Sequence, residues 1–478
     1  MSKPIWQWSA LETRDAVREH RVSVLEVVQA QLDHMRRTNP SINAITIDLG
    51  DHAIKQAKAS DEALACGVEP GPLHGVPVTL KHNIDIAGLP NSSGVAALAD
   101  NIAWLDAPVV KRLYDAGAVC IGLTNTPEFS MRAFTDNPLY GLTLNPWDEA
   151  ITCGGSSGGA GAALASGIGT LAHGNDIGGS LRYPAHFNGV VAIKPGLGRV
   201  AHHNASAPDN RPIGMQLFSS QGPMARNVAD ARLFLDVISG FDIRDPWSVA
   251  SASDLDVKNI GANPVRVAVA KVPGSVMASA AVMGIIRQAA DWLDNAGYEV
   301  EEVTLPDLDP CWQNWWDILY TELCVAMRDD MLSMGGKDFK TSLSFCDTYG
   351  RMLDLPDYMA AFGKRLHHLR VWCTFMEDYP LVLTPLVAQD APSPRGDIES
   401  EEQSRAFYQD SARFIGIVNY LGLPAAAVPA GLSNGHPVGV QLIGRALYES
   451  QVLDAAAIIE NQAGILVETL WERSNSGV

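Results

Sequence analysis

The sequence predicts an α/β protein built as one large domain. Segments with the pattern of strands alternate along the chain with segments with the pattern of helices, which is the rhythm of α/β proteins. No change of composition, long linker or internal repeat divides the 478 residues. Apolar residues make up 47% of the chain and charged residues 19%, which is typical of a globular protein that can bury a large core. We therefore treat residues 1–478 as one unit.

The elements follow in this order along the chain. Apolar residues recur at helical spacing over 9–37, which predicts two packed helices. After the turn PGPLHG, the alternating stretch VPVTLK predicts a short strand that ends on Lys81. The next predicted elements are a helix over 108–119, a strand over 120–125, a helix over 158–165 and a strand over 189–195. Later come a strand over 265–270, a helix over 281–297, and strands over 298–305, 381–385, 424–431 and 439–444.

Charge and apolar patterning exclude several classes of protein. The 35 basic and 54 acidic residues give a formal net charge of −19, and no basic run interrupts them. Such a surface repels phosphate and anionic lipid, so we expect no nucleic-acid partner and no membrane partner. No uninterrupted run of about eighteen apolar residues occurs, and the N-terminus lacks the pattern of a signal peptide. We expect a soluble, cytoplasmic protein whose seven scattered cysteines are buried, reduced thiols.

Two glycine- and serine-rich stretches lie close together, CGGSSGGAG at 153–161 and GNDIGGSLRYP at 174–184. The first contains G-x-S-x-G, the nucleophile elbow of α/β-hydrolases, which would make Ser156 the nucleophile. An elbow needs a strand directly before it, whereas NPWDEAITC is rich in turn residues. A glycine pattern over 167–172 resembles a dinucleotide fingerprint, but no hydrophobic strand leads into it.

The second stretch permits a different chemistry. Successive backbone N–H groups in GNDIGGS can point into one concavity that binds negative charge. Ser180, which closes this turn, could then attack a carbonyl while the N–H groups stabilise the oxyanion. The glycines could equally serve only to form a tight loop, and the loop alone does not decide between the two interpretations.

A nucleophilic serine also needs a base. The histidines around these loops show no clear triad order. A lysine can serve if burial lowers its pKa, and Lys81 is the candidate because an apolar strand carries it toward the core. Lysines are usually exposed, so a surface position for Lys81 remains open at this point.

Five stretches, taken together and in order, resemble the amidase signature family of serine hydrolases. They are GVPVTLKHNID, GLTNTPEFSM, NPWDEAITCGGSSGGAGAALASG, GNDIGGSLRYPAHFNGVVAIKP and GLPAAAVPAGLSNGHPVGVQLIG. The similarity runs from about residue 9 to residue 462. It implies a single large α/β domain with a central mixed β-sheet flanked by helices. The signature core would span 70–200, and the part over 260–478 would complete the sheet and the substrate pocket.

The resemblance implies a Ser–cis-Ser–Lys triad and no metal or cofactor. Ser180 would form the acyl-enzyme, and Ser156, which would follow a cis peptide bond, would relay protons between Ser180 and Lys81. The other implied site residues are the backbone N–H groups of Ile177, Gly178, Gly179 and Ser180 for the oxyanion, Ser130 in the pocket-wall segment EFSMRAF, and Asp176 and Arg182 as loop supports. For Asp176 and Arg182, an ordinary structural ion pair is almost the same prediction.

Some positions depart from the family pattern. His82 stands where an acid is common, and we expect its side chain to point away from Lys81. Asn175 replaces a common threonine. The A-type subunits of tRNA-dependent amidotransferases usually have threonine at Ile177 and glutamine at Tyr183, so the chain looks less like that branch.

The substrate is predicted only as a class. One face of a predicted helix carries Trp312, Trp315, Trp316, Leu319 and Tyr320. Such a stripe more often packs in a core, and the alternative is an aromatic pocket wall that favours aryl or hydrophobic amides. For Arg132 we favour a surface role over recognition of a carboxylate.

We therefore expect an amidase that hydrolyses a small carboxamide to a carboxylate and ammonia or an amine. Its partner would be a small-molecule amide, and a homodimer is one possible assembly. Two rival functions remain, an A-type subunit of a tRNA-dependent amidotransferase and an α/β-hydrolase esterase acting from Ser156.

Overall fold

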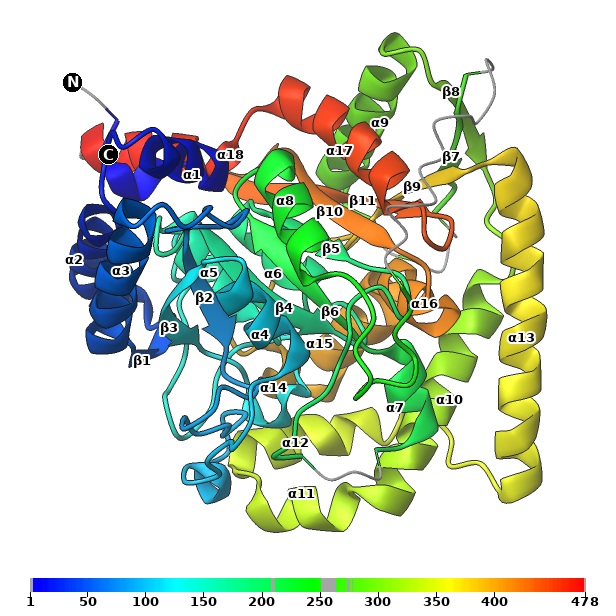
Figure 1. Ribbon diagram of the computed structural model, residues 1–478. Coiled ribbons are helices and arrows are strands. Elements are labelled where there is room, and N and C mark those ends of the chain that lie inside the picture. The colour runs from blue at the N-terminus through cyan, green and yellow to red at the C-terminus, as the bar shows by residue number, and fades with distance from the viewer. Residues whose placement is uncertain (1–2, 208–210, 251–263, 273–275, 277, 477–478) are drawn as a thin grey trace.

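One mixed sheet organises the part of the chain that the structure describes. The computed structural model describes residues 3–207, 211–250, 264–272, 276 and 278–476. Within them the sheet has 11 strands in the order β1-β3-β2-β4-β6-β5-β10-β11-β9-β7-β8 (Figure 1). The strands are β1 (Ile45–Asp48), β2 (Pro77–Lys81), β3 (Val119–Thr124), β4 (Leu171–Asp176), β5 (Val191–Lys194), β6 (Ser220–Ala225), β7 (Arg266–Ala270), β8 (Glu299–Val303), β9 (Leu381–Pro385), β10 (Ala425–Ser433) and β11 (His436–Gly444).

The parallel pairing of β2 with β4 brings two loops together. Val78 of β2 pairs with Leu171 of β4, and Thr79 pairs with Ala172. The carboxyl ends of parallel strands meet at one edge of a sheet, which is where ligands commonly bind in α/β folds. Lys81 ends β2 and Asp176 ends β4, so the register places both at this edge.

Helices cover both faces of the sheet. They are α1 (Ala10–Arg18), α2 (Val24–Ile42), α3 (Gly50–Ala65), α4 (Pro108–Asp115), α5 (Gly158–Ala165), α6 (Arg182–Asn188), α7 (Ile213–Phe218), α8 (Val228–Ile238), α9 (Ala280–Asn295), α10 (Leu308–Ala326), α11 (Arg328–Met334), α12 (Lys337–Cys346), α13 (Leu355–Asp378), α14 (Gly396–Glu399), α15 (Glu401–Arg405), α16 (Arg413–Leu421), α17 (Glu449–Ala463) and α18 (Leu466–Ser476). Short 3₁₀ turns are η1 (Ile5–Gln7), η2 (Ala96–Leu98) and η3 (Glu128–Ser130), and η5 (Ala406–Ser411) is a π-helical turn.

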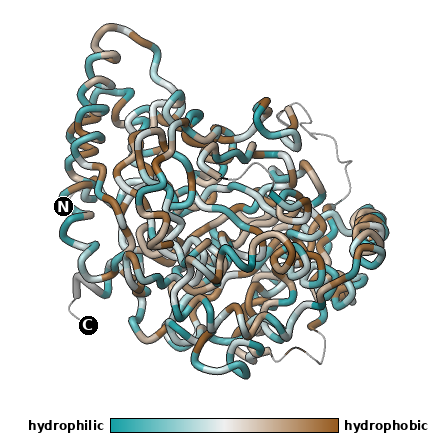
Figure 2. The backbone as a smooth tube through the Cα atoms, turned by 90° about the horizontal axis from the view of Figure 1, so that it is seen from below, coloured by the Kyte–Doolittle hydropathy of each residue, from teal (hydrophilic) through white to brown (hydrophobic). Residues whose placement is uncertain are grey.

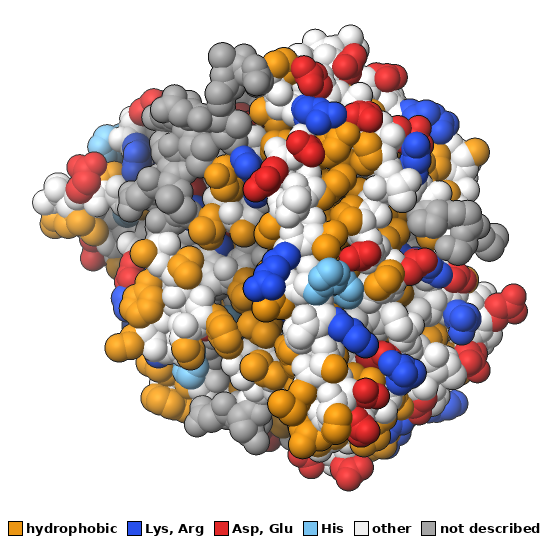
Figure 3. Space-filling view, turned by 90° about the vertical axis from the view of Figure 1, so that its right-hand side faces the viewer, with side chains coloured by type: hydrophobic (Ala, Val, Ile, Leu, Met, Phe, Trp, Pro, Cys, Tyr) orange, Lys and Arg blue, Asp and Glu red, His pale blue; other side chains and the backbone are white. Residues whose placement is uncertain are grey.

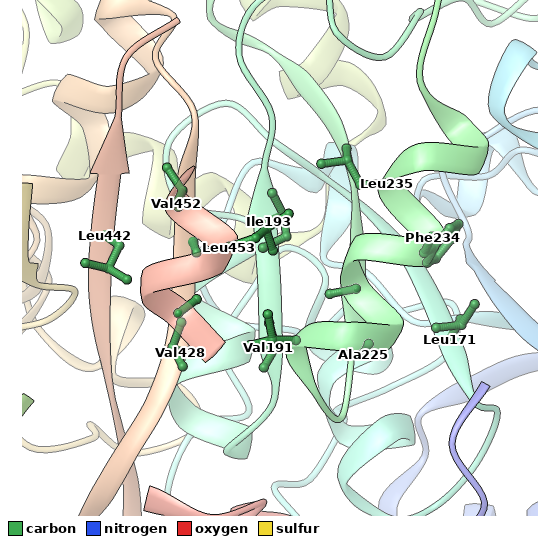
Figure 4. Packing of buried hydrophobic residues seen from close by; sticks show 14 of the residues in the cluster. Leu171, Val191, Ile193, Ala225, Phe234, Leu235, Val428, Leu442, Val452 and Leu453 are labelled. Atoms are coloured by element: carbon green, nitrogen blue, oxygen red, sulfur yellow. The ribbon is translucent and has the colours of Figure 1, made fainter. Parts of the chain in front are cut away.

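A large core lies between the sheet and one layer of these helices. In it α8 and α17 pack over the middle strands: Leu453 of α17 lies beside Ile193 of β5, and Phe234 of α8 lies near Leu171 of β4 (Figure 4). On the opposite face, α5 and α6 pack beside β4 and β5 and carry the loops of the site. Burial of this much apolar surface is the main force that holds the loops in place.

The surface has a mixed character. Outer helices alternate between hydrophilic and hydrophobic residues, as expected of helices with one buried side (Figure 2). On the face toward α13, acidic and basic side chains are interspersed among apolar ones (Figure 3). Among the described residues, no helix combines the length and apolarity needed to cross a bilayer.

Most of the predicted elements are present close to their expected bounds. Serine capping boxes start α1 at Ser9 and α2 at Ser23, and the helix over 158–165 is α5. The predicted C-terminal part begins and ends in residues outside the described set, 260–263 and 477–478. The expectation that all cysteines are buried was wrong: all are free thiols, but Cys66 and Cys373 are exposed.

Candidate active site

Lys81 lies at the centre of the candidate site and is fully buried. Its Nζ donates to Ser156 Oγ at 2.7 Å and to Asn175 Oδ1 at 2.7 Å. Burial lowers the pKa of the Lys81 ammonium well below its usual value, and the negative charge of Asp176 opposes that shift only in part. The surface position that was still open for Lys81 is therefore excluded, and the side chain is suited to act as a base near neutral pH.

Ser156 lies in the loop that leads into α5 and is 1% exposed. The Gly155–Ser156 peptide bond is cis. A side chain at Gly155 would be forced against the backbone of Ala133 and Phe134, at 2.7 and 2.6 Å, so the glycine lets the two segments approach. The strand that a nucleophile elbow requires does not precede Ser156, since the described residues just before it form only an isolated bridge between Leu144 and Thr152.

Ser180 lies in the turn between β4 and α6 and faces a pocket. The backbone N–H of Ser157 donates to the Ser180 carbonyl at 3.1 Å, which ties the two glycine-rich loops together. The side-chain contact within the predicted triad is the one between Lys81 and Ser156. Ser180 joins this pair through the backbone, and the described hydrogen bonds include none between the two serine hydroxyls.

Asp176 organises the turn that carries Ser180. Its carboxylate accepts the backbone N–H groups of Gly179 at 2.7 Å and Leu181 at 3.1 Å. The Gly179 N–H is therefore already used inside the turn. Among the described residues, the backbone N–H groups of Ile177, Gly178 and Ser180 have no such partner, so they remain available to a ligand.

A buried ion pair fixes Asp176 itself. The Arg182 guanidinium, fully buried, donates through Nε and Nη2 to the carboxylate at 3.0 Å each. Burial alone would raise the pKa of Asp176, but the charge and hydrogen bonds of Arg182 hold it well below its usual value. Arg182 Nη1 also donates to Gln441 Oε1 at 2.6 Å, and Asn419 Nδ2 donates to Asp176 Oδ1 at 3.0 Å. The network anchors the turn to β11 and α16.

An apolar pocket opens beside Ser180. Its walls come from the Ser180 turn, the segment 130–133, α10 and α12. The lining residues are Ser130, Met131, Arg132, Ala133, Ile177, Gly178, Ser180, Tyr183, Met215, Trp312, Trp315, Trp316, Leu319, Tyr320, Leu323, Phe339, Ser342, Leu343, Cys346 and Tyr408. Such a cavity, with few polar groups, fits a substrate with a hydrophobic body.

The tryptophans of α10 combine the two predicted roles. Trp312 and Trp315 belong to a buried core cluster and also line the pocket. Their rings stack with centroids 5.2 Å apart, and Trp316 meets Trp315 edge-on at 5.0 Å. A Cβ added to Gly178 would lie 2.6 Å from Trp315 Cζ2, so the indole packs directly on the Ser180 turn.

Arg132 corrects the expectation of a surface role. Its side chain is 1% exposed and donates through Nε and Nη2 to Asp397 at 2.7 Å each. The guanidinium is therefore neutralised inside the protein, because a buried charge needs a partner. This pairing also leaves Arg132 poorly suited to recognise a substrate carboxylate.

Two asparagines complete the surroundings of Lys81. Asn83 follows β2, and Asn175 lies on β4. The sequence analysis assigned no role to Asn83, because an isolated asparagine after a strand matches no sequence motif. His82 points elsewhere, as expected, with Nδ1 2.9 Å from Thr46 Oγ1. No group of three or more His, Cys, Asp or Glu side chains in the described part of the chain is arranged to hold a metal ion.

Comparison with known proteins agrees with this geometry. A family model described as "Amidase" matches residues 26–453. The chain is 51% identical over 469 residues to an indoleacetamide hydrolase of Bradyrhizobium diazoefficiens, covering 98% of this chain and 89% of the relative. It is 32% identical over 481 residues to the A-type subunit of the glutamyl-tRNA(Gln) amidotransferase of Carboxydothermus hydrogenoformans, covering 95% and 97%.

A solved structure gives the same result for the fold. The crystal structure of a bacterial aryl acylamidase of the amidase signature family superposes with a TM-score of 0.84 at 25% identity, covering 98% of this chain and 99% of that one. The predicted α/β fold with a central mixed sheet is thereby confirmed. The chain belongs to the amidase signature family and is an amidase that hydrolyses carbon–nitrogen amide bonds.

Proposed function

We propose that the chain hydrolyses an arylacetamide of the indoleacetamide type through an acyl-enzyme on Ser180. The observation that carries this proposal is the buried 2.7 Å contact between Lys81 Nζ and Ser156 Oγ, beside a pocket that contains Ser180 and three tryptophans. A base with a lowered pKa, a hydroxyl relay and an adjacent nucleophile are the parts that acyl transfer requires.

The reaction begins with Lys81 as a neutral amine. Lys81 accepts the proton of Ser156 while Ser156 accepts the proton of Ser180, and Ser180 Oγ bonds to the amide carbon. Ser156 then gives its proton to the leaving nitrogen as the C–N bond breaks, and Lys81 returns a proton to Ser156. Ammonia departs, and the same relay activates a water that hydrolyses the Ser180 ester to the carboxylate.

The oxyanion would lie in the Ser180 turn. The free backbone N–H groups of Ile177, Gly178 and Ser180 support this assignment, whereas the Gly179 N–H is engaged by Asp176. Each fixed donor of this kind typically lowers the barrier by about 3–4 kcal/mol. Asp176 and Arg182 act as supports because their ion pair holds the turn in the shape that exposes these donors.

The pocket and the relatives support the same substrate class. The stacked rings of Trp312 and Trp315 offer a flat apolar surface that matches a planar aromatic body. The relative at 51% identity and a second one at 47% identity are both named indoleacetamide hydrolase.

The two rival functions receive less support. Likeness to the amidotransferase relative is 32% identity against 51% for the indoleacetamide hydrolase. The pocket side chains Ile177 and Tyr183 are apolar or aromatic, which suits a hydrophobic substrate better than glutamine. An esterase acting from Ser156 lacks its leading strand, and Ser156 is 1% exposed while Ser180 faces the pocket.

The test is a panel of primary amides assayed for ammonia release by the purified chain alone. Indole-3-acetamide and phenylacetamide should be hydrolysed with much higher kcat/KM than acetamide or glutamine, and Ser180→Ala should abolish the activity. Glutamine as the best substrate, or activity that appears only with a second protein chain, would favour the amidotransferase function. Full activity in Ser180→Ala with loss in Ser156→Ala would favour the esterase-type site.

A further inference from the structure

A series of hydrogen-bonded polar side chains connects the pocket wall to Lys81. Ser130 Oγ, at the pocket, accepts from Asn83 Nδ2 at 2.8 Å. Asn83 and Asn175 then pair head to tail: Asn175 Nδ2 donates to Asn83 Oδ1 at 2.9 Å, and Asn83 Nδ2 donates to Asn175 Oδ1 at 3.2 Å. Asn175 Oδ1 also accepts from Lys81 Nζ at 2.7 Å.

At the pocket wall, this hydrogen-bonded series ends at Ser130, which lies in a backbone segment of unusual conformation. Phe129 and Ser130 both have left-handed conformations, with φ of 55° and 57°. Two consecutive non-glycine residues in this region are uncommon and need support from their surroundings. The hydroxyls of Ser130 and Thr126 lie 2.9 Å apart, which together with the Asn83 contact fixes the Ser130 side chain.

The orientation of the Asn175 amide matters for the chemistry of Lys81. A neutral amine has two N–H groups and one lone pair, and the lone pair must face Ser156 to take its proton. An acceptor at Asn175 Oδ1 holds one N–H group of the neutral amine, which leaves the lone pair free to face Ser156, the other partner of Nζ at 2.7 Å. If the amide turned over, its NH₂ group would face the lysine and compete with Ser156 for the lone pair.

We propose that Asn83 is a positioning residue that fixes the Asn175 amide, and through it the Lys81 amine, from the pocket wall at Ser130. This role rests on the proposed function, since it requires Lys81 to be the base. The Asn83 backbone N–H donates to the Lys81 carbonyl at 2.8 Å, but its side chain makes no hydrogen bond to the Lys81 amine. The Asn83 side chain therefore acts through Asn175, whose Nδ2 group it holds. In the described part of the chain, the charged or titratable groups that act on Lys81 are Asp176 and His173, both on β4, and neither is hydrogen-bonded to Asn83.

The experiment compares Asn83→Ala in two backgrounds. In the natural background, removal of the amide should lower kcat for indole-3-acetamide about tenfold to hundredfold, as misplacement of a catalytic group does, with KM within about threefold. In Asn175→Thr, a hydroxyl can accept from Lys81 with no amide to orient, so adding Asn83→Ala should change kcat less than about twofold. Non-additivity of this kind is the signature of residues that act as one unit.

A matched control separates positioning from loosening of the loop. Asn204 Nδ2 donates to the backbone carbonyl of Asn83 at 3.0 Å and leaves its amide alone. Asn204→Ala should therefore keep kcat near the natural value. Asn83→Ser keeps a polar side chain, but one that is too short to reach Asn175. It should therefore lose as much kcat as Asn83→Ala, and it replaces that variant in the experiment if Asn83→Ala folds poorly.

The outcomes distinguish this inference from the proposed function. Equal losses from Asn83→Ala in both backgrounds, or a raised KM with unchanged kcat, would overturn the positioning role. If Lys81→Met and Ser180→Ala are inactive but Asn83→Ala is fully active, the positioning role of Asn83 is overturned and the proposed function stands. Turnover retained in Lys81→Met would overturn the proposed function itself.

Discussion

The buried carboxylate of Asp176 holds both the Arg182 charge and the Ser180 turn, so replacing it with asparagine tests whether this ion pair shapes the site. Asp176→Asn keeps the size of the side chain but removes its charge. Arg182, fully buried, would then lose the only carboxylate that it contacts among the described residues. Gly179 and Leu181 would also lose the charged acceptor that shapes the Ser180 turn.

The expected magnitude follows from these contacts. Removing one partner of a buried ion pair costs about 3–5 kcal/mol, because the remaining charge stays uncompensated. The backbone N–H groups lose charge-assisted hydrogen bonds worth about 1.5–3 kcal/mol each, which overlap with the first figure rather than add to it. We expect the free energy of unfolding to fall by about 3–5 kcal/mol and kcat/KM to fall by at least about a hundredfold.

Urea unfolding across pH, with kinetics on the same samples, measures both effects. Because the folded pKa of Asp176 lies below its usual value, its contribution to stability is present above that usual value and is lost as pH falls toward the folded pKa. Asp176→Asn should remove this acid dependence. As a control, Asp397→Asn breaks the equally buried pair with Arg132 and should cost similar stability with a smaller loss in kcat. A stable, fully active Asp176→Asn would refute this account of the turn.

Two further predictions concern the base and the pocket. Burial lowers the pKa of Lys81, and the amine must be neutral to accept a proton. We therefore expect kcat/KM to rise with pH through the pKa of Lys81 and to stay high above it. A profile that declines from acid to neutral pH would contradict a lysine base. Gly178→Ala should displace Trp315, because the Trp315 ring would lie 2.6 Å from the new Cβ. The variant should lower kcat/KM for indole-3-acetamide more than for acetamide. Equal losses for both substrates would argue against Trp315 as part of the aromatic wall.

The sequence predicted the fold best where local patterns and burial agree. Alternation in VPVTLK predicted β2, and small residues predicted α5, because each segment is buried along its whole length. The strand β6, SQGPMA, was not predicted, since Gly222 and Pro223 disfavour a strand locally. Its antiparallel pairing with β4 and β5 overrides that preference, and such long-range pairing is invisible in a local window.

The candidate site was predictable where it lies on motifs and not where it depends on distant contacts. The positions of Lys81, Ser156 and Ser180 could be taken from the family resemblance. The pairing of Arg132 with Asp397, 265 positions apart, leaves no mark in the sequence, and the surface role predicted for Arg132 was therefore wrong. The Asn83–Asn175 amide pair likewise joins the residue two positions after β2 to a residue on β4, and it becomes visible only in three dimensions.

The most direct test of the central claim is the site of covalent labelling by an active-site fluorophosphonate. Peptide mapping of the labelled protein should place the adduct on Ser180, and labelling should slow sharply in Lys81→Met because the relay through Ser156 loses its base. An adduct on Ser156, or labelling of Ser180 at an unchanged rate in Lys81→Met, would contradict the account.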